Sequence, residues 1–366
     1  MGSVWGNRLK ISIFGESHGP AIGVVLDGLP HGIPLDFEAI AFQMARRAPG
    51  NHPHATERKE SDLPQIQSGV HAGRTTGAPL CALIANTNTR SADYSDIADQ
   101  PRPSHADWTA HLRYAGCNDV RGGGHFSGRL TAPIVFAGSM ARQALKQMGI
   151  SVGGRITQIG SVLDSPLSEP ITQEALLSLA KKSLAVFSSS AEQKMAESIE
   201  NARGEGDSLG GIVEVIAHNV PAGWGSPMFD TVEGRLAQLL FGIPAVKGVE
   251  FGSGFALAHM RGSEANDAFL PTQPITTATN HSGGINGGIT NGMPIVFRAA
   301  IKPTASIAKQ QKTFRISTGE AAELQVSGRH DPCIVPRALP VLEAATAIVL
   351  LDLALEMEGT QWIRKK

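Results

Sequence analysis

Two histidines in constrained turns are the first candidates for chemistry in this chain of 366 residues. His18 lies in a glycine-bounded turn, and His105 follows a proline that stiffens its approach. Asp107 is close enough in sequence to orient the His105 ring. A positioned histidine can act as a general acid, a contribution of about 10²–10⁴ in rate. Each turn also has a structural interpretation, either a histidine that bonds its own backbone or a polar surface turn.

The turn around His18 also matches the Gly-x-Ser-x-Gly pattern of a serine nucleophile, at Gly15–Gly19. In that motif the serine sits between a strand and a helix. Here residues 21–26 read Ala-Ile-Gly-Val-Val-Leu, which favours a strand after the turn. The context of the motif is therefore missing, and a serine hydrolase that uses Ser17 remains only as an alternative.

Three further segments have the composition of anion-binding loops. Gly122–Gly124 precede Arg129 and a predicted helix, whose N-terminus attracts negative charge. Lys302–Ser306 places a lysine and two hydroxyls around a rigid proline, which suits a phosphate. The third segment pairs Arg329, a bidentate anion clamp, with Asp331, whose backbone the following proline restricts. Simple turns and helix caps are the structural alternatives, because the first segment lacks the pattern of a nucleotide-binding loop.

The overall composition argues against several other classes of function. A net charge of -1 and a pI of about 6.9 give no sign of a nucleic-acid or membrane-surface partner. The three cysteines form no Cys-x-x-Cys pair, and the histidines lack metal-site spacing, so no metal is expected. The N-terminus has no apolar signal region, and the apolar stretch 345–355 is too short to span a bilayer. The simplest expectation is a cytoplasmic protein.

The hydrophobic pattern mixes strands and helices without strict alternation. It predicts one α+β domain of layered sheets and helices over residues 1–366. Strands are expected at 10–14, 22–27, 81–86, 211–218 and 294–301, and helices at 36–47, 130–148, 189–205, 229–241 and 336–358. Asp36 is the expected N-cap of the first helix. Arg46 and Arg47 end that helix, where cations complement its dipole.

Taken together and in this order, the motifs resemble those of the chorismate synthase family over residues 6–355. The segments that carry the resemblance are Gly15–Pro20, Arg102–Asp107, Arg121–Gly124, Ala245–Glu250, Asn280–Gly284, Lys302–Thr304 and Ser327–Cys333. The resemblance implies a β-α-β sandwich subunit and a homotetramer. It also implies conversion of 5-enolpyruvylshikimate 3-phosphate to chorismate and phosphate. This anti-1,4-elimination involves no net redox change but requires reduced FMN.

The resemblance also implies roles for the candidate acid–base groups. His18 resembles the histidine that protonates reduced flavin, and His105 the one that delivers a proton to the departing phosphate. Asp331 resembles the carboxylate that deprotonates the flavin N5 position. Arg46, Arg129 and Arg329 would hold the phosphate and carboxylates of the substrate. These assignments suit the side chains, because phosphate leaves more readily when it is protonated or ion-paired.

The same resemblance implies a set of cofactor contacts. The positions that match FMN contacts are His125, Phe126, Ser127, Pro244, Ala245, Gly287, Lys302, Pro303, Thr304, Ala305, Ser306 and Arg329. Arg47 matches a position assigned to NADPH contact. The sequence has neither an appended reductase domain nor a dinucleotide-binding fingerprint, so reduced FMN is expected from an external source.

Four positions depart from the family pattern. Many relatives carry arginine where this chain has Ala48, Pro53 and His125, and a polar residue where it has Pro244. The lost cations weaken the predicted substrate clamp and the NADPH contact. A paralogue that binds flavin or a phosphorylated acid without turnover is therefore the second alternative.

Overall fold

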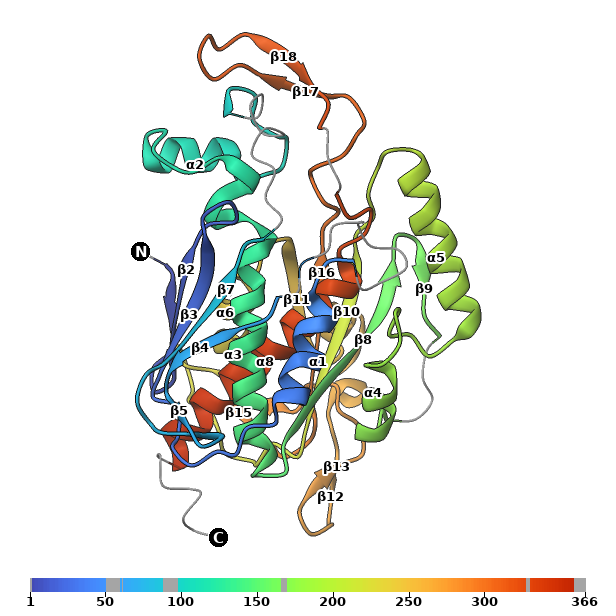
Figure 1. The fold of residues 1–366 in the computed structure, drawn as a ribbon. Helices are drawn as coiled ribbons and strands as arrows, with labels where there is room; N and C mark the ends of the chain where they lie inside the picture. Colours follow the sequence, from blue (N-terminus) through green and yellow to red (C-terminus); the bar gives the residue numbers. More distant parts are fainter. Residues whose placement is uncertain are drawn as a thin grey trace.

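Two five-stranded antiparallel sheets enclose a layer of helices in the computed structural model (Figure 1). The structure describes residues 2–50, 60, 62–87, 98–165, 170–326 and 330–358. The predicted α+β class, with antiparallel sheets layered on helices, is confirmed.

The first sheet contains the turn that carries His18. Its strand order is β1 (Val4–Trp5), β2 (Lys10–Gly15), β3 (Ala21–Asp27), β7 (Leu80–Ala85) and β4 (Gln65–Ser68). Strands β2 and β3 pair in register from Lys10–Asp27 to Gly15–Ile22, so the glycine-bounded turn connects two strands, as predicted. Ile22, Val24 and Leu26 alternate along β3 and are buried against the helices.

The second sheet forms the opposite layer. Its strand order is β11 (Val246–Phe251), β16 (Ile295–Ile301), β10 (Gly211–His218), β8 (Ser151–Ile159) and β9 (Val162–Leu163). Along β16, Ile295, Phe297, Ala299 and Ile301 alternate with less buried residues and face the core. The strand β8 was not predicted. It contains Gly153 and Gly154, which weaken the pattern of a strand.

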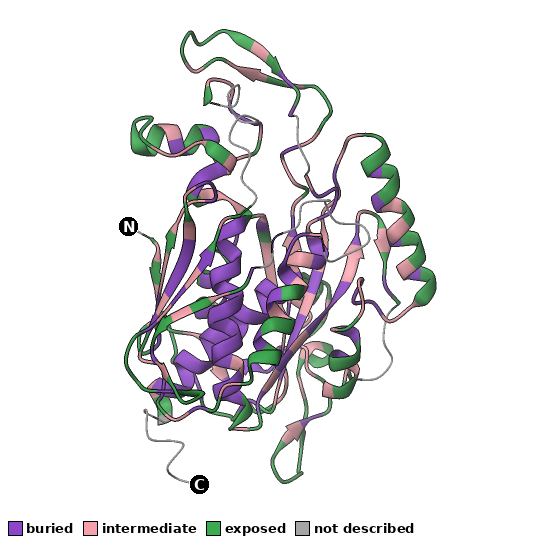
Figure 2. Ribbon diagram, viewed as in Figure 1, coloured by how far each residue is buried: buried purple, intermediate pink, exposed green. Residues whose placement is uncertain are grey.

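The helix layer consists of α1 (Phe37–Arg47), α3 (Thr131–Lys146) and α8 (Val335–Glu358). Figure 2 shows α3 and α8 as mostly buried segments between the sheets. Helix α3 packs on the first sheet, α8 on the second, and the two helices pack on each other. One cluster of buried hydrophobic residues therefore runs through all three layers. Asp36 caps α1 as predicted, because its side chain accepts a hydrogen bond from the Ala39 N–H.

The remaining elements lie around this sandwich. They are α2 (Asp107–Tyr114), α4 (Gln173–Leu179), α5 (Ser189–Gly204), α6 (Val232–Phe241), α7 (Gly262–Ala265) and the 3₁₀ turns Arg121–Phe126, Gly128–Leu130 and Gly254–His259. Four hairpins pair β5 (Val70–His71) with β6 (Arg74–Thr75), β12 (Phe269–Leu270) with β13 (Thr276–Thr277), β14 (Ile285–Asn286) with β15 (Ile289–Thr290), and β17 (Gln311–Phe314) with β18 (Ala321–Leu324). The hairpin β17–β18 and α2 project at the top of Figure 1.

Helix α8 corrects one sequence-based expectation. The helix has 24 residues, so the prediction that this apolar segment is too short for a bilayer is wrong. Its most apolar stretch has a mean hydropathy of 2.0 and is 94% buried inside the protein. The apolar side chains that a lipid would contact are already packed against the second sheet and against α1, α3 and α6.

Buried carboxylates on α8 hold other elements against it. Asp352 is fully buried and accepts hydrogen bonds from the backbone N–H groups of Asn7, Arg8 and Leu9 at 3.0, 2.7 and 2.7 Å. It also forms an ion pair with Arg235 of α6. These partners offset the cost of burying the charge and fix the chain as it enters β2.

A second buried carboxylate, Glu343, joins the three central helices. It pairs with Arg46 of α1 at 2.5 Å and with Arg142 of α3 at 3.2 Å. Burial raises the pKa of Glu343, but the attraction of the two guanidinium groups outweighs burial and leaves the pKa below its ordinary value. The Glu343 side chain is therefore a structural anion, and Arg46 is one of its ion-pair partners.

The contact between α3 and α8 depends on Gly138. A Cβ at this position would lie 2.3 Å from the Cβ and 2.4 Å from the Cα of Ala344. Gly138→Ala should therefore force the helices apart and lower the free energy of unfolding by about 1–3 kcal/mol. Urea unfolding followed by circular dichroism measures this change.

Gly204→Ala is the matched control, because nothing lies within 4 Å of its added methyl group at the end of α5. We expect this variant to be as stable as the unsubstituted protein or slightly more stable. Equal stability of the two variants would contradict a close-packed α3–α8 contact.

Candidate active site

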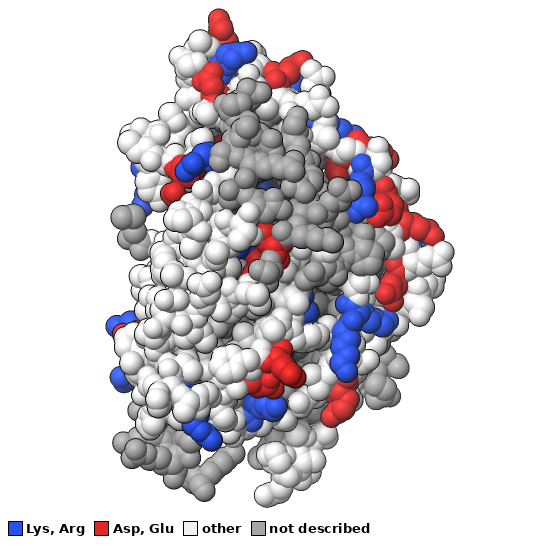
Figure 3. All heavy atoms as spheres, viewed as in Figure 1, with Lys and Arg blue, Asp and Glu red and all other residues white. Residues whose placement is uncertain are grey.

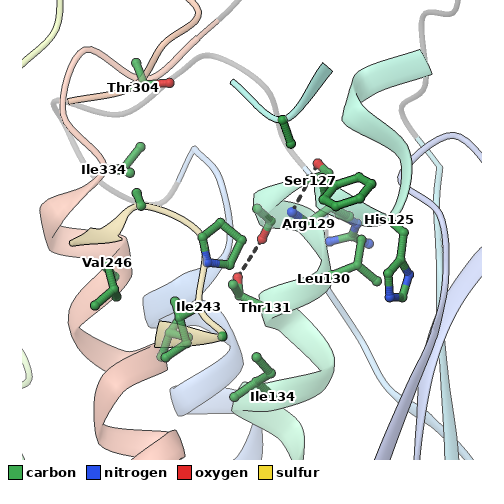
Figure 4. A pocket seen from close by; sticks show the side chains of 18 of the residues that line it. His125, Ser127, Arg129, Leu130, Thr131, Ile134, Ile243, Val246, Thr304 and Ile334 are labelled. Carbon is green, nitrogen blue, oxygen red and sulfur yellow. Dashed lines mark hydrogen bonds between the residues drawn. The ribbon is translucent and has the colours of Figure 1, made fainter. Parts of the chain in front are cut away.

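A cavity of about 1110 Å³ opens at the N-terminal ends of α3 and α8. Leu130, Thr131 and Ile134 line it from α3 and the turn before it, and Ile334 and Arg337 from the start of α8. Figure 4 shows His125, Ser127, Arg129 and Thr131 on one side of the pocket, and Thr304, Ile334 and Val246 on the other. The volume lies just above the usual 300–1,000 Å³ of a site for one small ligand.

Both apolar and cationic side chains line this cavity. Leu130, Ile134, Ile243, Val246 and Ile334 provide apolar surface that a flat ring system can cover. The Lys and Arg residues in the lining are Arg47, Arg102, Arg129, Lys247, Lys302 and Arg337, and the carboxylates are Glu60 and Asp331. On the surface in Figure 3, by contrast, basic and acidic side chains are interspersed. Basic side chains therefore outnumber carboxylates in the cavity lining, although Asp62 and Asp107 behind the wall pair with several of them.

His105 lines the cavity and is held there by a network of buried polar groups. Its Nδ1 lies 2.6 Å from Asp107 Oδ1, and its side chain is 20% exposed. Arg102 donates to both oxygens of the same carboxylate, from Nε and Nη2, each at 2.8 Å. Arg102 Nη1 also donates to Ser306 Oγ at 3.0 Å. The His105 loop is therefore tied to the Lys302–Ser306 segment.

The carboxylate of Asp107 is ionised at neutral pH. Burial raises the pKa of Asp107, but hydrogen bonds from Arg102 and His105 outweigh that effect and bring the pKa well below its usual range. A carboxylate can only accept hydrogen bonds, so the contact with His105 requires a proton on Nδ1.

Two of the three glycines predicted to approach an anion pack against the two histidines. Gly122, Gly123 and Gly124 have φ of 60°, 82° and 52°, which favour glycine. A Cβ at Gly122 would lie 2.2 Å from His18 Cε1 and Nδ1, and one at Gly123 would lie 3.1 Å from His105 Cε1. The segment is glycine-rich because it packs against both imidazole rings.

His18 is buried and lies behind Gly122 rather than in the cavity lining. Its Nδ1 is 3.1 Å from Ser17 Oγ, and that hydroxyl is within hydrogen-bonding distance of the carbonyls of Gly122 and Arg121, at 3.0 and 3.2 Å. Because β3 follows this turn, Ser17 has no helix behind it as a serine nucleophile requires. The hydrolase alternative therefore lacks structural support.

Arg47 and Arg129 share a buried acidic partner. Arg47 Nη1 lies 2.6 Å from Asp62 Oδ2, and Arg129 Nη1 contacts the other oxygen of Asp62. Arg47 also donates to Thr131 Oγ1 and the Gly128 carbonyl, at 3.0 and 2.8 Å. Burial lowers the pKa of Arg47 to about 10, against the opposing attraction of Asp62. The guanidinium groups at this wall are thus held by the protein itself.

Asp331 lines the cavity at the start of α8 and pairs with Arg337. Arg337 Nε donates to the backbone carbonyl of Arg47 at 2.9 Å, so it links the end of α1 to the start of α8. The carboxylate of Asp331 is only 8% exposed. This arrangement fixes a candidate proton acceptor in the wall of the cavity.

Lys247 and Lys302 differ from these arginines in their ion-pair partners. Lys302 Nζ donates to the Ser104 carbonyl at 2.5 Å. Burial lowers the pKa of Lys302, and repulsion from Lys247 lowers it further. Within the described residues neither lysine forms an ion pair with a carboxylate. An anionic ligand between them would relieve the repulsion.

Most of the predicted site residues meet at this cavity. The predicted cofactor and acid–base residues in its lining are His105, His125, Phe126, Ser127, Pro244, Ala245, Lys302, Pro303, Thr304, Ala305, Ser306, Arg47 and Asp331, together with the predicted substrate residue Arg129. Gly287 does not line it, because it lies in the turn between β14 and β15. Arg329 and Pro53 lie outside the described residues. Arg46 is also absent from the lining, since Glu343 holds its guanidinium group.

Sequence reasoning missed several residues of the site. Arg102 and Lys247 belong to quoted motifs but received no role, and Arg337 and Asp62 lie in segments without a distinctive pattern. Only the first two could have been identified from the motifs. Among the described residues, no group of three or more His, Cys, Asp or Glu side chains is arranged to hold a metal ion.

Comparisons with known proteins identify the family of the chain. The model of a protein family described as chorismate synthase matches residues 9–355. Chorismate synthase of Dehalococcoides mccartyi is 45% identical over 97% of both chains, and that of Thermococcus kodakarensis 47% identical over 95% of this chain and 96% of its own. A crystal structure of chorismate synthase superimposes with a TM-score of 0.75 at 29% identity, covering 99% of this chain and 97% of the other. The chain belongs to the chorismate synthase family.

Proposed function

We propose that this protein converts 5-enolpyruvylshikimate 3-phosphate to chorismate and phosphate, in the shikimate pathway to aromatic amino acids. The observation that carries the proposal is one cavity with His105, Asp331, Lys247 and Lys302 in its wall, in a chain of this family. In the reaction the bond between C3 and the phosphate oxygen breaks, C6 loses a hydrogen, and a conjugated diene forms without net oxidation.

The residues of the cavity fit reduced FMN as the cofactor. The apolar surface around Ile243 and Ile334 suits a flavin ring, and Lys302 with the hydroxyls of Thr304 and Ser306 suits a phosphate. When bound, reduced FMN would supply the electron density that helps phosphate to leave. The proposed cofactor residues His125–Ser127 and Pro244–Ala245 complete this wall.

His105 and Asp331 are the proposed proton donor and acceptor facing the substrate. With Nδ1–H of His105 bound to Asp107, the second proton of the imidazolium, on Nε2, is the one proposed to pass to the departing phosphate oxygen. Asp331, held by Arg337, accepts a proton on a carboxylate oxygen. His18 lies behind Gly122 and is proposed to act as a proton donor toward the cofactor, with Ser17 fixing its ring.

Arg129 is the best supported of the proposed substrate-binding arginines, since it lines the cavity. Arg329 is proposed on the resemblance alone. Arg46 is likewise proposed on the resemblance alone, since its guanidinium group pairs with the buried Glu343 and does not line the cavity.

We propose an external source of reduced FMN, with NADPH serving only that source. The donor groups of Arg47 bond to Asp62, Thr131 and Gly128, which leaves its predicted NADPH contact without support. Purified protein with FMN should therefore not oxidise NADPH under anaerobic conditions, as followed at 340 nm in an absorbance trace. Steady NADPH oxidation would contradict this proposal.

We further propose one domain over residues 1–366, a cytoplasmic location, a homotetramer, and neither nucleic-acid nor membrane partners. The common core supports one domain. Large apolar side chains at the surface support assembly: Met228, Phe229, Phe255 and Phe269 are 78–91% exposed. A monomer in analytical ultracentrifugation would exclude the tetramer.

Phosphate release from 5-enolpyruvylshikimate 3-phosphate tests the proposed function directly. Under anaerobic conditions, dithionite-reduced FMN should support release together with chorismate formation, and oxidised FMN should not. If the folded protein binds ligand but releases no phosphate under either condition, it is instead the non-catalytic paralogue. Ala48 and Pro53 would then be the first positions to replace by arginine.

His105→Ala should slow turnover by about 10²–10⁴-fold, the usual contribution of a general acid. FMN binding, measured by fluorescence titration, should change little because the imidazole acts on the phosphate. His111→Ala is the matched control, since this histidine lies on α2 outside the cavity lining and should keep full activity. Unchanged turnover in His105→Ala would remove this residue from the mechanism.

Anion binding should be coupled to proton uptake at Lys302. Its pKa is lowered in the unliganded protein, and a nearby phosphate would raise it again. As the pH rises toward the ordinary pKa of a lysine, the binding of FMN should therefore be accompanied by proton uptake. Calorimetry in two buffers of different ionisation enthalpy measures this uptake.

Lys302→Arg should remove this uptake, because arginine stays protonated. Lys309→Arg is the control, as Lys309 lies outside the cavity with Asp207 and Glu205. The same uptake in the Lys302→Arg variant would contradict a phosphate site at this lysine.

A further inference from the structure

The carboxylate of Asp107 is the centre of a hydrogen-bond network that no part of the proposed chemistry uses directly. Oδ1 accepts from His105 Nδ1 at 2.6 Å and from Arg102 Nη2 at 2.8 Å. Oδ2 accepts from Arg102 Nε at 2.8 Å and from the backbone N–H of Arg102 at 3.0 Å. The side chain is 6% exposed and does not line the cavity.

This network determines which nitrogen of His105 faces the ligand. Because both oxygens of Asp107 only accept, Nδ1 must carry a proton. Arg102 Nη2 lies 3.0 Å from the same Nδ1, but it is also a donor, so it cannot bond a protonated nitrogen. Nε2 is then the only ring nitrogen that can exchange a proton with a ligand in the cavity.

The network also fixes the place of the ring. Asp107 is the first residue of α2, and the αL conformation of Ser104, with φ of 60°, precedes His105. Arg102 extends the network to Ser306 Oγ, and Lys302 Nζ bonds the Ser104 carbonyl. The imidazole and the proposed phosphate-binding segment are thus held as one unit.

We propose that Asp107 is a positioning residue, which with Arg102 keeps a proton on Nδ1 of His105 and aims Nε2 at the departing phosphate. The proton that is transferred is then the one on Nε2 of the doubly protonated ring, and the Nδ1–H tautomer is what remains after the transfer. The proposal rests on the proposed function for the identity of the reaction, but not for the tautomer. Asp107 acts through His105 and does not touch the substrate.

Asp107→Asn tests the proposal while preserving the size of the side chain. The amide has one acceptor, which Arg102 Nε and the Arg102 backbone N–H would occupy. Its NH₂ group and Arg102 Nη2 would then both face Nδ1, so Nδ1 should become an acceptor and Nε2 should carry the proton. In that tautomer the ring could give up its Nε2 proton only by becoming an imidazolate anion, so it would be a poor general acid. We expect kcat to fall about 10- to 100-fold with KM and FMN affinity nearly unchanged.

Two measurements separate positioning from a general structural role. Long-range ¹H–¹⁵N spectra of histidine-labelled protein, recorded above neutral pH, should show a protonated Nδ1 in the unsubstituted protein and a non-protonated Nδ1 in Asp107→Asn. In the His105→Ala background, Asp107→Asn should cause little further loss of kcat, since residues that act as a unit are not additive.

Asp99→Asn is the matched control, because this aspartate bonds Ser317 and lies outside the cavity. It should leave kcat and the His105 resonances unchanged. An unchanged tautomer in Asp107→Asn, or a loss of kcat that adds to that of His105→Ala, would overturn the proposal. Absence of turnover in the unsubstituted protein would refute the proposed function, while the spectra would still decide the role of Asp107.

Discussion

The close contact of α3 and α8 is the constraint on which the site depends. Gly138 leaves no room for a Cβ against Ala344, so the two helices cross with their backbones near each other. Each helix also covers one sheet, so this contact sets the separation of the two layers. The cavity forms where both helices begin, and it receives Thr131 and Ile134 from one and Asp331 and Arg337 from the segment that starts the other.

Buried charge in this protein falls into two groups with different purposes. Asp352, Glu343 and Asp62 are each surrounded by cationic or backbone donors, so they hold elements together. Arg46 is an ion-pair partner of Glu343, and Arg47 is an ion-pair partner of Asp62. Lys247 and Lys302 instead both line the cavity, and burial lowers the pKa of Lys302. The structure thus distinguishes cations that support the fold from cations that can receive a phosphate.

The sequence predicted the main elements well where local signals are strong. The capped helix after Asp36 and the alternating strand that ends at Ile301 are confirmed. It missed β8, whose two glycines lack the side chains of a typical strand. The family motifs correctly brought His105 and Lys302 to one cavity, although nothing local to either residue indicates the other.

Side-chain direction was the information that the motifs lacked. Arg46 and Arg47 are neighbours in sequence, but successive residues of an α-helix point about 100° apart. One therefore meets Glu343 and the other the cavity wall. Likewise, Arg102 could be quoted from its motif, but its role depends on Ser306, which is distant in sequence. Such contacts exist only once both sheets have been assembled on the helices.

The most direct test of this account is a crystal structure of the protein with FMN and 5-enolpyruvylshikimate 3-phosphate. The account predicts both ligands in the single cavity, with the substrate phosphate oxygen within hydrogen-bonding distance of His105 Nε2. It also predicts that an FMN phosphate lies beside Lys302. Flavin bound outside this cavity, or a substrate phosphate remote from His105, would contradict the account.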